Sequence, residues 1–188
     1  MRFLVSLATF AAAAAAYDTT PFLGPLQPWT VSSLQITAPQ KGGQGAVDIE
    51  VAVANPNTVS AGPAPHAAGG GYLPFSPSAA NCSLAGTSED CEETSDTSYG
   101  VWSVGVVGDG VDPTDLDLKF RLDYNVTRWN AVWYKVYEGT GHFATGVNLV
   151  QGGCDGAAGT CEYEIAAPVL VQPTMTECKG TCTMPSAS

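Results

Sequence analysis

Carboxylates are the main side chains in this sequence that could do acid–base chemistry, and only two histidines accompany them. A serine hydrolase of the nucleophile-elbow type needs a Gly-x-Ser-x-Gly motif, which is absent. His142 lies near Glu138, but a histidine in a Gly-Thr-Gly-His turn is typical of an exposed surface. A glycosidase needs two facing carboxylates, and Glu162 and Glu164 share one face of a predicted strand. Because any outward-facing pair would do the same, the sequence predicts no catalytic residue.

Two groups of residues carry the atom types that metals prefer. The cysteines include no Cys-x-x-Cys pair, and His66 and His142 are far from them without ligand spacing. The turn from Asp109 to Asp117 is rich in aspartate, which calcium favours, but its spacing fits no EF-hand. Aspartate is also common in turns because it bonds to its own backbone. We expect no metal and no cofactor, with a weak calcium site at this turn as the alternative.

The first 16 residues predict a secretory signal peptide. A basic start, Met1-Arg2, precedes an apolar run from Phe3 to Ala16 that ends in small residues, so cleavage is expected after Ala16. The run is too short for a membrane span. The sequence therefore predicts an extracellular protein.

Six cysteines indicate three disulfides in such a protein. Fifteen connectivities are possible for six cysteines, and close spacing favours the nearest pairs. Each short loop would contribute about 2–3 kcal/mol in the chain-entropy model. The predicted pairs are Cys82–Cys91, Cys154–Cys161 and Cys178–Cys182.

The charge is strongly acidic and excludes some partner classes. Removal of Arg2 leaves six of the seven basic residues against 18 acidic ones. Such a chain repels nucleic acid and anionic membranes. Four of the six basic residues lie on two predicted central strands: Lys119, Arg121, Arg128 and Lys135. They predict a docking face for an acidic partner or, alternatively, cross-strand pairing with Asp117, Asp123 and Glu138.

The two central strands have the clearest pattern in the chain. Apolar and charged residues alternate from Leu116 to Tyr124, which is typical of a strand with one buried face. A turn is expected at Asn125-Val126-Thr127, and Trp129 to Tyr137 forms the second, aromatic-rich strand. A tight turn at Gly139–Gly141 then ends this pair.

Shorter strands surround this pair. Trp29–Ile36 is predicted to be a strand with a β-bulge at Ser32-Ser33, and Val47–Ala54 alternates cleanly. Residues 60–80, rich in Gly, Pro and Ala, predict a long loop. Further strands are expected at Tyr99–Val107, Phe143–Val150, Glu162–Ile165 and Val169–Val171.

These patterns predict an all-β fold: a single disulfide-stapled antiparallel β-barrel or β-sandwich of about seven or eight strands. The expected organisation is a signal peptide (1–16), an extended segment (17–28), the β domain (29–172) and a C-terminal tail (173–188). Oligomeric state is not indicated.

Two sequons and four tryptophans are further candidate site residues. Asn125 precedes Val126-Thr127 and is the favoured glycosylation site, whereas Asn81 adjoins a disulfide cysteine. The tryptophans are typical of core or edge positions, and a sugar or lipid site is the alternative. They are Trp29, Trp102, Trp129 and Trp133.

The order of these features resembles the fungal small secreted proteins built on the fold of the major Alternaria allergen. The matching features span about Trp29 to Val171: the early strand at Trp29–Leu34, the strand at Val47–Val53, the cysteines at 82 and 91, and the Gly-rich hairpin from Cys154 to Cys161. The 60–80 segment and the Cys178/Cys182 pair depart from that pattern.

The resemblance implies a secreted, allergen- or effector-like protein that is not an enzyme and that binds a host defence protein or a small phenolic or apolar ligand. One alternative is a secreted carbohydrate-binding or carbohydrate-active β-sandwich, which requires paired carboxylates in an aromatic-lined groove. Another alternative is a structural surface protein.

Overall fold

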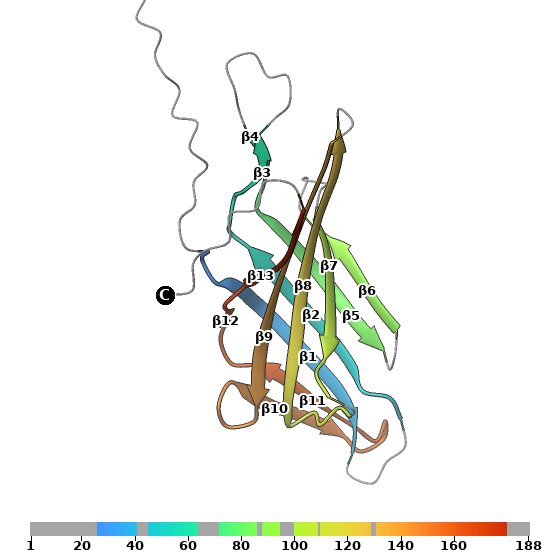
Figure 1. The fold of residues 1–188 in the computed structure, drawn as a ribbon. Coiled ribbons are helices and arrows are strands. Elements are labelled where there is room, and N and C mark those ends of the chain that lie inside the picture. Colours follow the sequence, from blue (N-terminus) through green and yellow to red (C-terminus); the bar gives the residue numbers. More distant parts are fainter. Residues whose placement is uncertain are drawn as a thin grey trace, which may run out of the picture.

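The computed structural model describes residues 26–40, 45–63, 72–85, 88–94, 100–108, 110–128 and 131–179. These residues form thirteen β-strands and no helix, so the prediction of an all-β fold is confirmed. All the pairings between strands are antiparallel. The strands form two main sheets that do not close into a barrel, which makes the fold sandwich-like (Figure 1). Among these residues, no helix is long and apolar enough to cross a membrane.

The larger of the two sheets, which we call the large sheet, has seven strands. They are β1 (Trp29–Pro39), β2 (Asp48–Asn55), β5 (Ser78–Ala85), β6 (Ser88–Glu93), β10 (Leu149–Asp155), β11 (Thr160–Ile165) and β12 (Val169–Val171). Their order is β10-β11-β1-β2-β5-β6, and β12 also pairs with β1. The register of β1 against β2 shifts between Val31 and Ser33, which confirms the predicted bulge.

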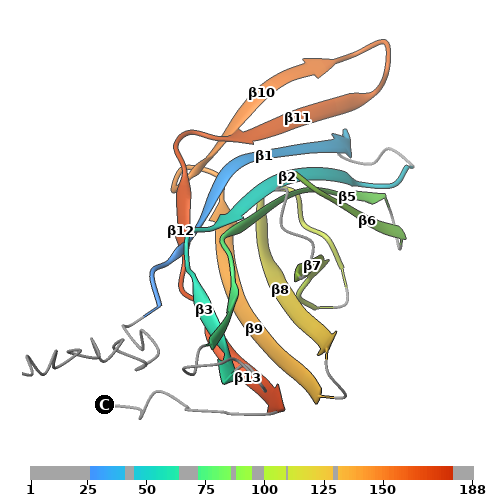
Figure 2. The same cartoon turned by 90° about the horizontal axis from the view of Figure 1, so that it is seen from above.

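The other main sheet, the small sheet, has four strands in the order β13-β9-β8-β7. They are β7 (Gly100–Val106), β8 (Asp115–Arg128), β9 (Ala131–Ala144) and β13 (Thr174–Lys179). The long pair β8 and β9 contains the predicted central strands, and Figure 2 shows the small sheet lying to one side of the stacked strands of the large sheet. A separate hairpin of β3 (Val59–Pro63) and β4 (Tyr72–Phe75) stands at one end of the molecule (Figure 1).

The core lies between the two sheets and follows from the alternation along each strand. Trp29, Ile36 and Val51 of the large sheet and Phe120 and Leu122 of the small sheet are all buried in one hydrophobic cluster. Alternate side chains therefore face inward, and their neighbours in sequence form the two outer faces. These outer faces are where polar groups are displayed.

Several predicted boundaries were wrong. Residues 60–80 were predicted as a loop, but this segment contains most of the β3–β4 hairpin and the start of β5. Residues 173–188 were predicted to be a C-terminal tail outside the β domain, yet β13 lies there and pairs with β9. The turn predicted at Asn125-Val126-Thr127 lies later, because β8 continues to Arg128 and β9 begins at Ala131.

The predicted turn at Gly139–Gly141 is also wrong, and the packing of the two sheets explains why. Both glycines lie inside β9, opposite Phe120 and Leu118. A Cβ added at Gly139 would lie 2.7 Å from Cγ1 of Val171 and 3.0 Å from the backbone oxygen of Gln172. Glycine is therefore required for the close approach of β12 rather than for a turn.

Two of the three predicted disulfides are confirmed. Cys82 and Cys91 face each other across β5 and β6, and Cys154 and Cys161 face each other across β10 and β11. Cys178 is also disulfide-bonded, and Cys182 lies outside the described residues. The predicted signal peptide likewise lies outside them.

Candidate functional site

The outer face of the large sheet is built from acidic and neutral strands that alternate. On β11, β2 and β6 the outward positions hold acidic side chains, in two positions per strand. The strands between them, β1 and β5, hold neutral side chains there, such as Gln35 and Ser83. One row across the sheet joins Glu164, Gln35, Glu50, Ser83 and Asp90 through successive Cα pairings. We call this surface the acidic face; its carboxylates belong to Asp48, Glu50, Asp90, Glu92, Glu162 and Glu164.

A hollow of about 420 Å³ opens on the acidic face. Small side chains, including Asn81 and Ser83 of β5, lie along its middle. Glu50 of β2 lies on one side of these β5 residues, and Asp90 and Glu92 of β6 lie on the other. Its remaining lining residues are Ser33, Gln35, Val51, Ala52 and Cys82. The lining contains no aromatic residue, so this hollow differs from the aromatic-lined groove that a glycosidase was predicted to need.

The carboxylates of the acidic face have no basic neighbours on their own sheet. The seven strands of the large sheet contain no Lys or Arg, but they contain nine acidic residues. These are Asp48, Glu50, Glu89, Asp90, Glu92, Glu93, Asp155, Glu162 and Glu164. The strands of the small sheet contain five basic and five acidic residues. Among the strands of the two sheets, the net negative charge therefore lies on the large sheet.

A second, smaller hollow adjoins the first on the same face. It has a volume of about 90 Å³ and is lined by Gln35, Gly152, Glu162, Tyr163 and Glu164. Tyr163 is itself buried, because its ring faces the core. The predicted pair Glu162 and Glu164 therefore belongs to the acidic face.

The outer face of the small sheet holds two of the four predicted docking residues, Lys119 and Arg121, but here the charges are paired with one another. The Nε of Arg121 lies 2.9 Å from Oδ1 of Asp123, and its Nη1 lies 3.2 Å from Oε1 of Glu138 and 3.6 Å from Glu177. Nζ of Lys119 lies 3.0 Å from the same Glu138 oxygen. We call these five residues the ion-pair cluster.

The ion-pair cluster also has a structural role. The hydrogen bond from Lys119 lowers the pKa of Glu138 below its ordinary value of 4.5. Val136 lies between Asp123 and Glu177 in the register and is fully buried, so the cluster covers this apolar side chain. Cross-strand pairing, the alternative interpretation of these basic residues, is therefore what the structure shows for Lys119 and Arg121.

Lys135 does not belong to this outer face, contrary to the prediction. It pairs with the inward-facing Tyr124 and is only 7% exposed. Its Nζ donates a hydrogen bond to the backbone oxygen of Ser60 in β3, and burial lowers the pKa of Lys135. Lys135 therefore ties the β3–β4 hairpin to the small sheet. The side chain of Arg128 lies outside the described residues.

His142 is exposed and held between two aspartates at one end of β8 and β9. Its Nδ1 lies 2.9 Å from Oδ1 of Asp117, and its Nε2 lies 3.7 Å from Oδ1 of Asp115. In the nearby turn, Oδ1 of Asp112 accepts hydrogen bonds from the backbone N–H and the hydroxyl of Thr114, which lowers the pKa of Asp112. Within the described ranges, no three His, Cys, Asp or Glu residues are placed to hold a metal. Asp109 and His66 lie outside those ranges.

Aromatic residues fill the interior. Trp29, Trp102 and Trp133 are all buried, as predicted for core positions, and Trp129 lies outside the described residues. The ring of Phe75 stacks on Tyr124 with centroids 4.5 Å apart. The gap between Leu26, Trp29, Asn55, Asn57, Val59, Tyr137 and Pro173 leaves no room for a water molecule. At this place the interior therefore offers no space for a phenolic ligand.

Tyr124 and Tyr137 are two titratable groups buried in this interior. The amide of Asn55 donates to the Tyr124 hydroxyl at 2.9 Å, and that hydroxyl donates to the backbone oxygen of Ser76. Burial raises the pKa of Tyr124, and it raises the pKa of Tyr137 to about 12. Both hydroxyls therefore stay protonated at neutral pH, and neither is suited to act as a base.

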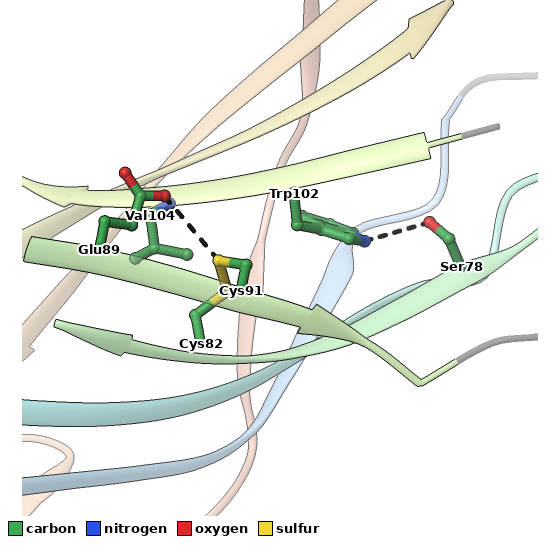
Figure 3. Close-up of a disulfide and its surroundings, with 6 residues drawn as sticks. All are labelled: Ser78, Cys82, Glu89, Cys91, Trp102 and Val104. Carbon is green, nitrogen blue, oxygen red and sulfur yellow. Dashed lines mark hydrogen bonds between the residues drawn. A yellow bond between two sulfur atoms is a disulfide. The ribbon is translucent and has the colours of Figure 1, made fainter. Parts of the chain in front are cut away.

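One acidic residue of β6 has a structural function, which Figure 3 shows. The carboxylate of Glu89 accepts a hydrogen bond from the backbone N–H of Val104 on β7. Nearby, the indole N–H of Trp102 donates to Ser78 at 3.2 Å. These bonds join the edge of the large sheet to the edge of the small sheet.

The two sequons occupy different places. Asn125 is exposed on β8 rather than in a turn, and Asn81 is exposed in the hollow of the acidic face. A glycan at Asn81 would fill the hollow, which gives this sequon a consequence that the sequence did not suggest.

The comparisons with known proteins give no relative: no family model, no curated protein and no solved structure matches this chain. The resemblance to the Alternaria allergen family therefore stays a prediction.

The acidic face could not be found from the sequence, although part of its signal was visible. The alternation of Asp48 and Glu50 with apolar residues, and that of Glu162 and Glu164, indicated outward carboxylates. Nothing local indicated that β11, β2 and β6 alternate in space with neutral strands, because this depends on the order of strands in the sheet.

Proposed function

We propose that this protein is an extracellular binding protein without catalytic activity, and that the acidic face is its binding surface. The predicted signal peptide supports export, and the disulfides are compatible with an extracellular protein. The observation that carries the proposal is the hollow of about 420 Å³, lined by hydrogen-bonding and acidic side chains from four adjacent strands. Such convergent polar groups in a concave surface are typical of a binding site.

The resemblance named above supports the same class of function, an allergen- or effector-like protein that binds a host protein. The proposal places that partner on the acidic face instead of on Lys119 and Arg121. Those two basic residues are already paired with carboxylates of their own sheet. A partner that bound there would have to break those ion pairs.

Carbohydrate binding is the second candidate. Ser33, Gln35, Asn81 and Ser83 offer hydroxyl and amide groups along the hollow, and such groups can bond to sugar hydroxyls. The hollow lacks the aromatic platform that would stack on a sugar ring. A protein partner is therefore the better fit.

A binding screen of the purified, secreted protein against plant defence proteins, glycans and phenolic compounds tests the proposal. The proposal expects a partner whose affinity falls at least about tenfold, or about 1.4 kcal/mol, in Glu50→Gln/Asp90→Asn. The matched control is Lys119→Gln/Arg121→Gln, which changes the outer face of the small sheet and should leave that affinity intact. The reverse pattern, with loss only in the control, would contradict the proposal.

A further inference from the structure

We infer that the hollow of the acidic face takes an extended, basic polypeptide segment of a protein partner, with Lys or Arg at alternate positions. The inference rests on the proposed function and names the chemistry of its ligand. The segment would run along β5, between Glu50 of β2 on one side and Asp90 and Glu92 of β6 on the other.

The carboxylates of the acidic face have no basic residues on their own strands to neutralise them. On the small sheet, Arg121 faces Glu138 across the strands and stabilises it. On the large sheet, Glu50 faces the neutral Gln35 and Ser83 instead. A basic residue at either position would stabilise the sheet through a cross-strand pair. The strands of the small sheet form such pairs, whereas the strands of the large sheet contain no Lys or Arg that could form them, which leaves the negative potential of the acidic face available to a cationic partner.

The spacing of the carboxylates also matches an extended peptide. Glu164, Glu50 and Asp90 are separated by two strand spacings each, or about 9.5 Å between strand axes. Asp90 and Glu92 are two residues apart on one strand, or about 6.8 Å. An extended peptide presents alternate side chains on one face with this same spacing of about 6.8 Å. A basic residue at every second position would therefore meet successive carboxylates of β6.

The same spacing disfavours other cationic ligands. A calcium ion needs several oxygens within about 2.6 Å, and the acidic strands are held apart by a neutral strand. No group of metal-ligating residues occurs among the described residues. A small organic cation would contact one or two carboxylates and leave the rest of the row unpaired. A polypeptide can follow β5 along the hollow, and its long basic side chains can reach the carboxylates on both sides of that strand.

The test uses two synthetic peptides of equal composition, labelled with a fluorophore: a Lys-Ser repeat and a Lys-Lys-Ser-Ser repeat. Only the first places all its lysines on one face of an extended chain. Anisotropy titration of the intact secreted protein should give the first peptide about tenfold higher affinity, with strong weakening by added salt. Glu50→Gln/Asp90→Asn should weaken this binding about tenfold, whereas the matched double variant Glu162→Gln/Glu164→Gln should weaken it less than about threefold.

The outcomes separate this inference from the proposed function. Equal affinity for both peptides, or equal loss in both double variants, would overturn the extended-segment inference and leave the acidic face as a general binding surface. A glycan on Asn81, detected by the intact mass of the secreted protein, would overturn it as well, because the protein's own sugar would occupy the hollow. A glycan partner that needs Glu50 and Asp90, with no peptide binding, would support the proposed function alone. Urea unfolding curves of both variants check that the fold is retained.

Discussion

The charged side chains on the outer faces of the two sheets are arranged in opposite ways. On the small sheet, Lys119 and Arg121 are paired with carboxylates, and the resulting cluster covers Val136. On the large sheet, strands with carboxylates alternate with strands of neutral side chains, and none of the seven strands contains Lys or Arg. Ion pairs of the first kind serve stability, whereas a row of unneutralised charge serves it poorly. The difference therefore distinguishes a structural face from a candidate binding face.

The two sheets also differ in how their edges are held. Disulfides join β5 to β6 and β10 to β11, which are the strand pairs at the two ends of the large sheet. A disulfide holds its two strands together even where carboxylates on the same face repel each other. The large sheet can therefore display its acidic face without the ion pairs that the small sheet uses.

Removal of the Cys82–Cys91 disulfide should have the largest effect. Cys82→Ala/Cys91→Ala should lower the free energy of unfolding by about 2.5 kcal/mol, because the closed loop joins residues nine apart. Urea unfolding measures this loss. Cys154→Ala/Cys161→Ala is the matched control: it should lose a similar amount of stability, but only the first variant should weaken binding at the hollow, since β6 carries Asp90 and Glu92. Equal binding by both variants would show that the hollow does not depend on the position of β6.

A larger side chain at the contact between β9 and β12 should cause the next largest loss of stability. Gly139→Val should lower the free energy of unfolding by about 2 kcal/mol, because its side chain would collide with Val171 and the backbone of Gln172. Gly105→Val on β7 is the matched control, since a Cβ there meets nothing within 4 Å. Thermal unfolding of the two variants would show the difference, and equal stability would contradict the close approach of β9 and β12.

Neutralising one carboxylate on each outer face should change stability by a smaller amount, and the change should differ between the two faces. Glu138→Gln should lower the free energy of unfolding by about 0.5–1 kcal/mol, because it leaves Lys119 and Arg121 without a shared partner. Glu50→Gln should leave stability unchanged or raise it by a few tenths of a kcal/mol, since it removes a charge without an internal partner. Urea unfolding at neutral pH and low salt gives both values. A loss in Glu50→Gln as large as that in Glu138→Gln would erase the distinction between the faces.

The pH dependence of the unfolding free energy should be the smallest of these effects, and it should come from Glu138 of the small sheet. Because the folded-state pKa of Glu138 is depressed below 4.5, its contribution to stability is complete above that pH. The contribution is lost as the pH falls through the depressed pKa. The difference in unfolding free energy between the wild type and Glu138→Gln should therefore shrink in acid below pH 4.5. A difference that stayed constant to low pH would show that Glu138 acts through packing instead of charge.

The sequence predicted features that depend on neighbouring residues. The alternation of Ile49 and Val51 with charged residues marked a half-buried strand, and the close cysteine spacing gave two correct disulfides. Predictions from the sequence were wrong for features that depend on contacts between distant segments. Gly139 looked like a turn residue because the approach of Val171 is invisible locally, and Lys135 looked like an outward charge although it pairs with Tyr124 inside.

Local sequence patterns were thus enough to predict the all-β class, the inward and outward alternation of the strands and two local disulfides. These follow from short-range periodicity and spacing, which act within a few residues. The arrangement of the strands in space was needed to show that Glu164, Glu50 and Asp90 share one row and that Lys119 and Arg121 are paired with carboxylates. The physical reason is that strand order joins segments from opposite ends of the chain, such as β1 with β11, through backbone hydrogen bonds that any residue except proline can make.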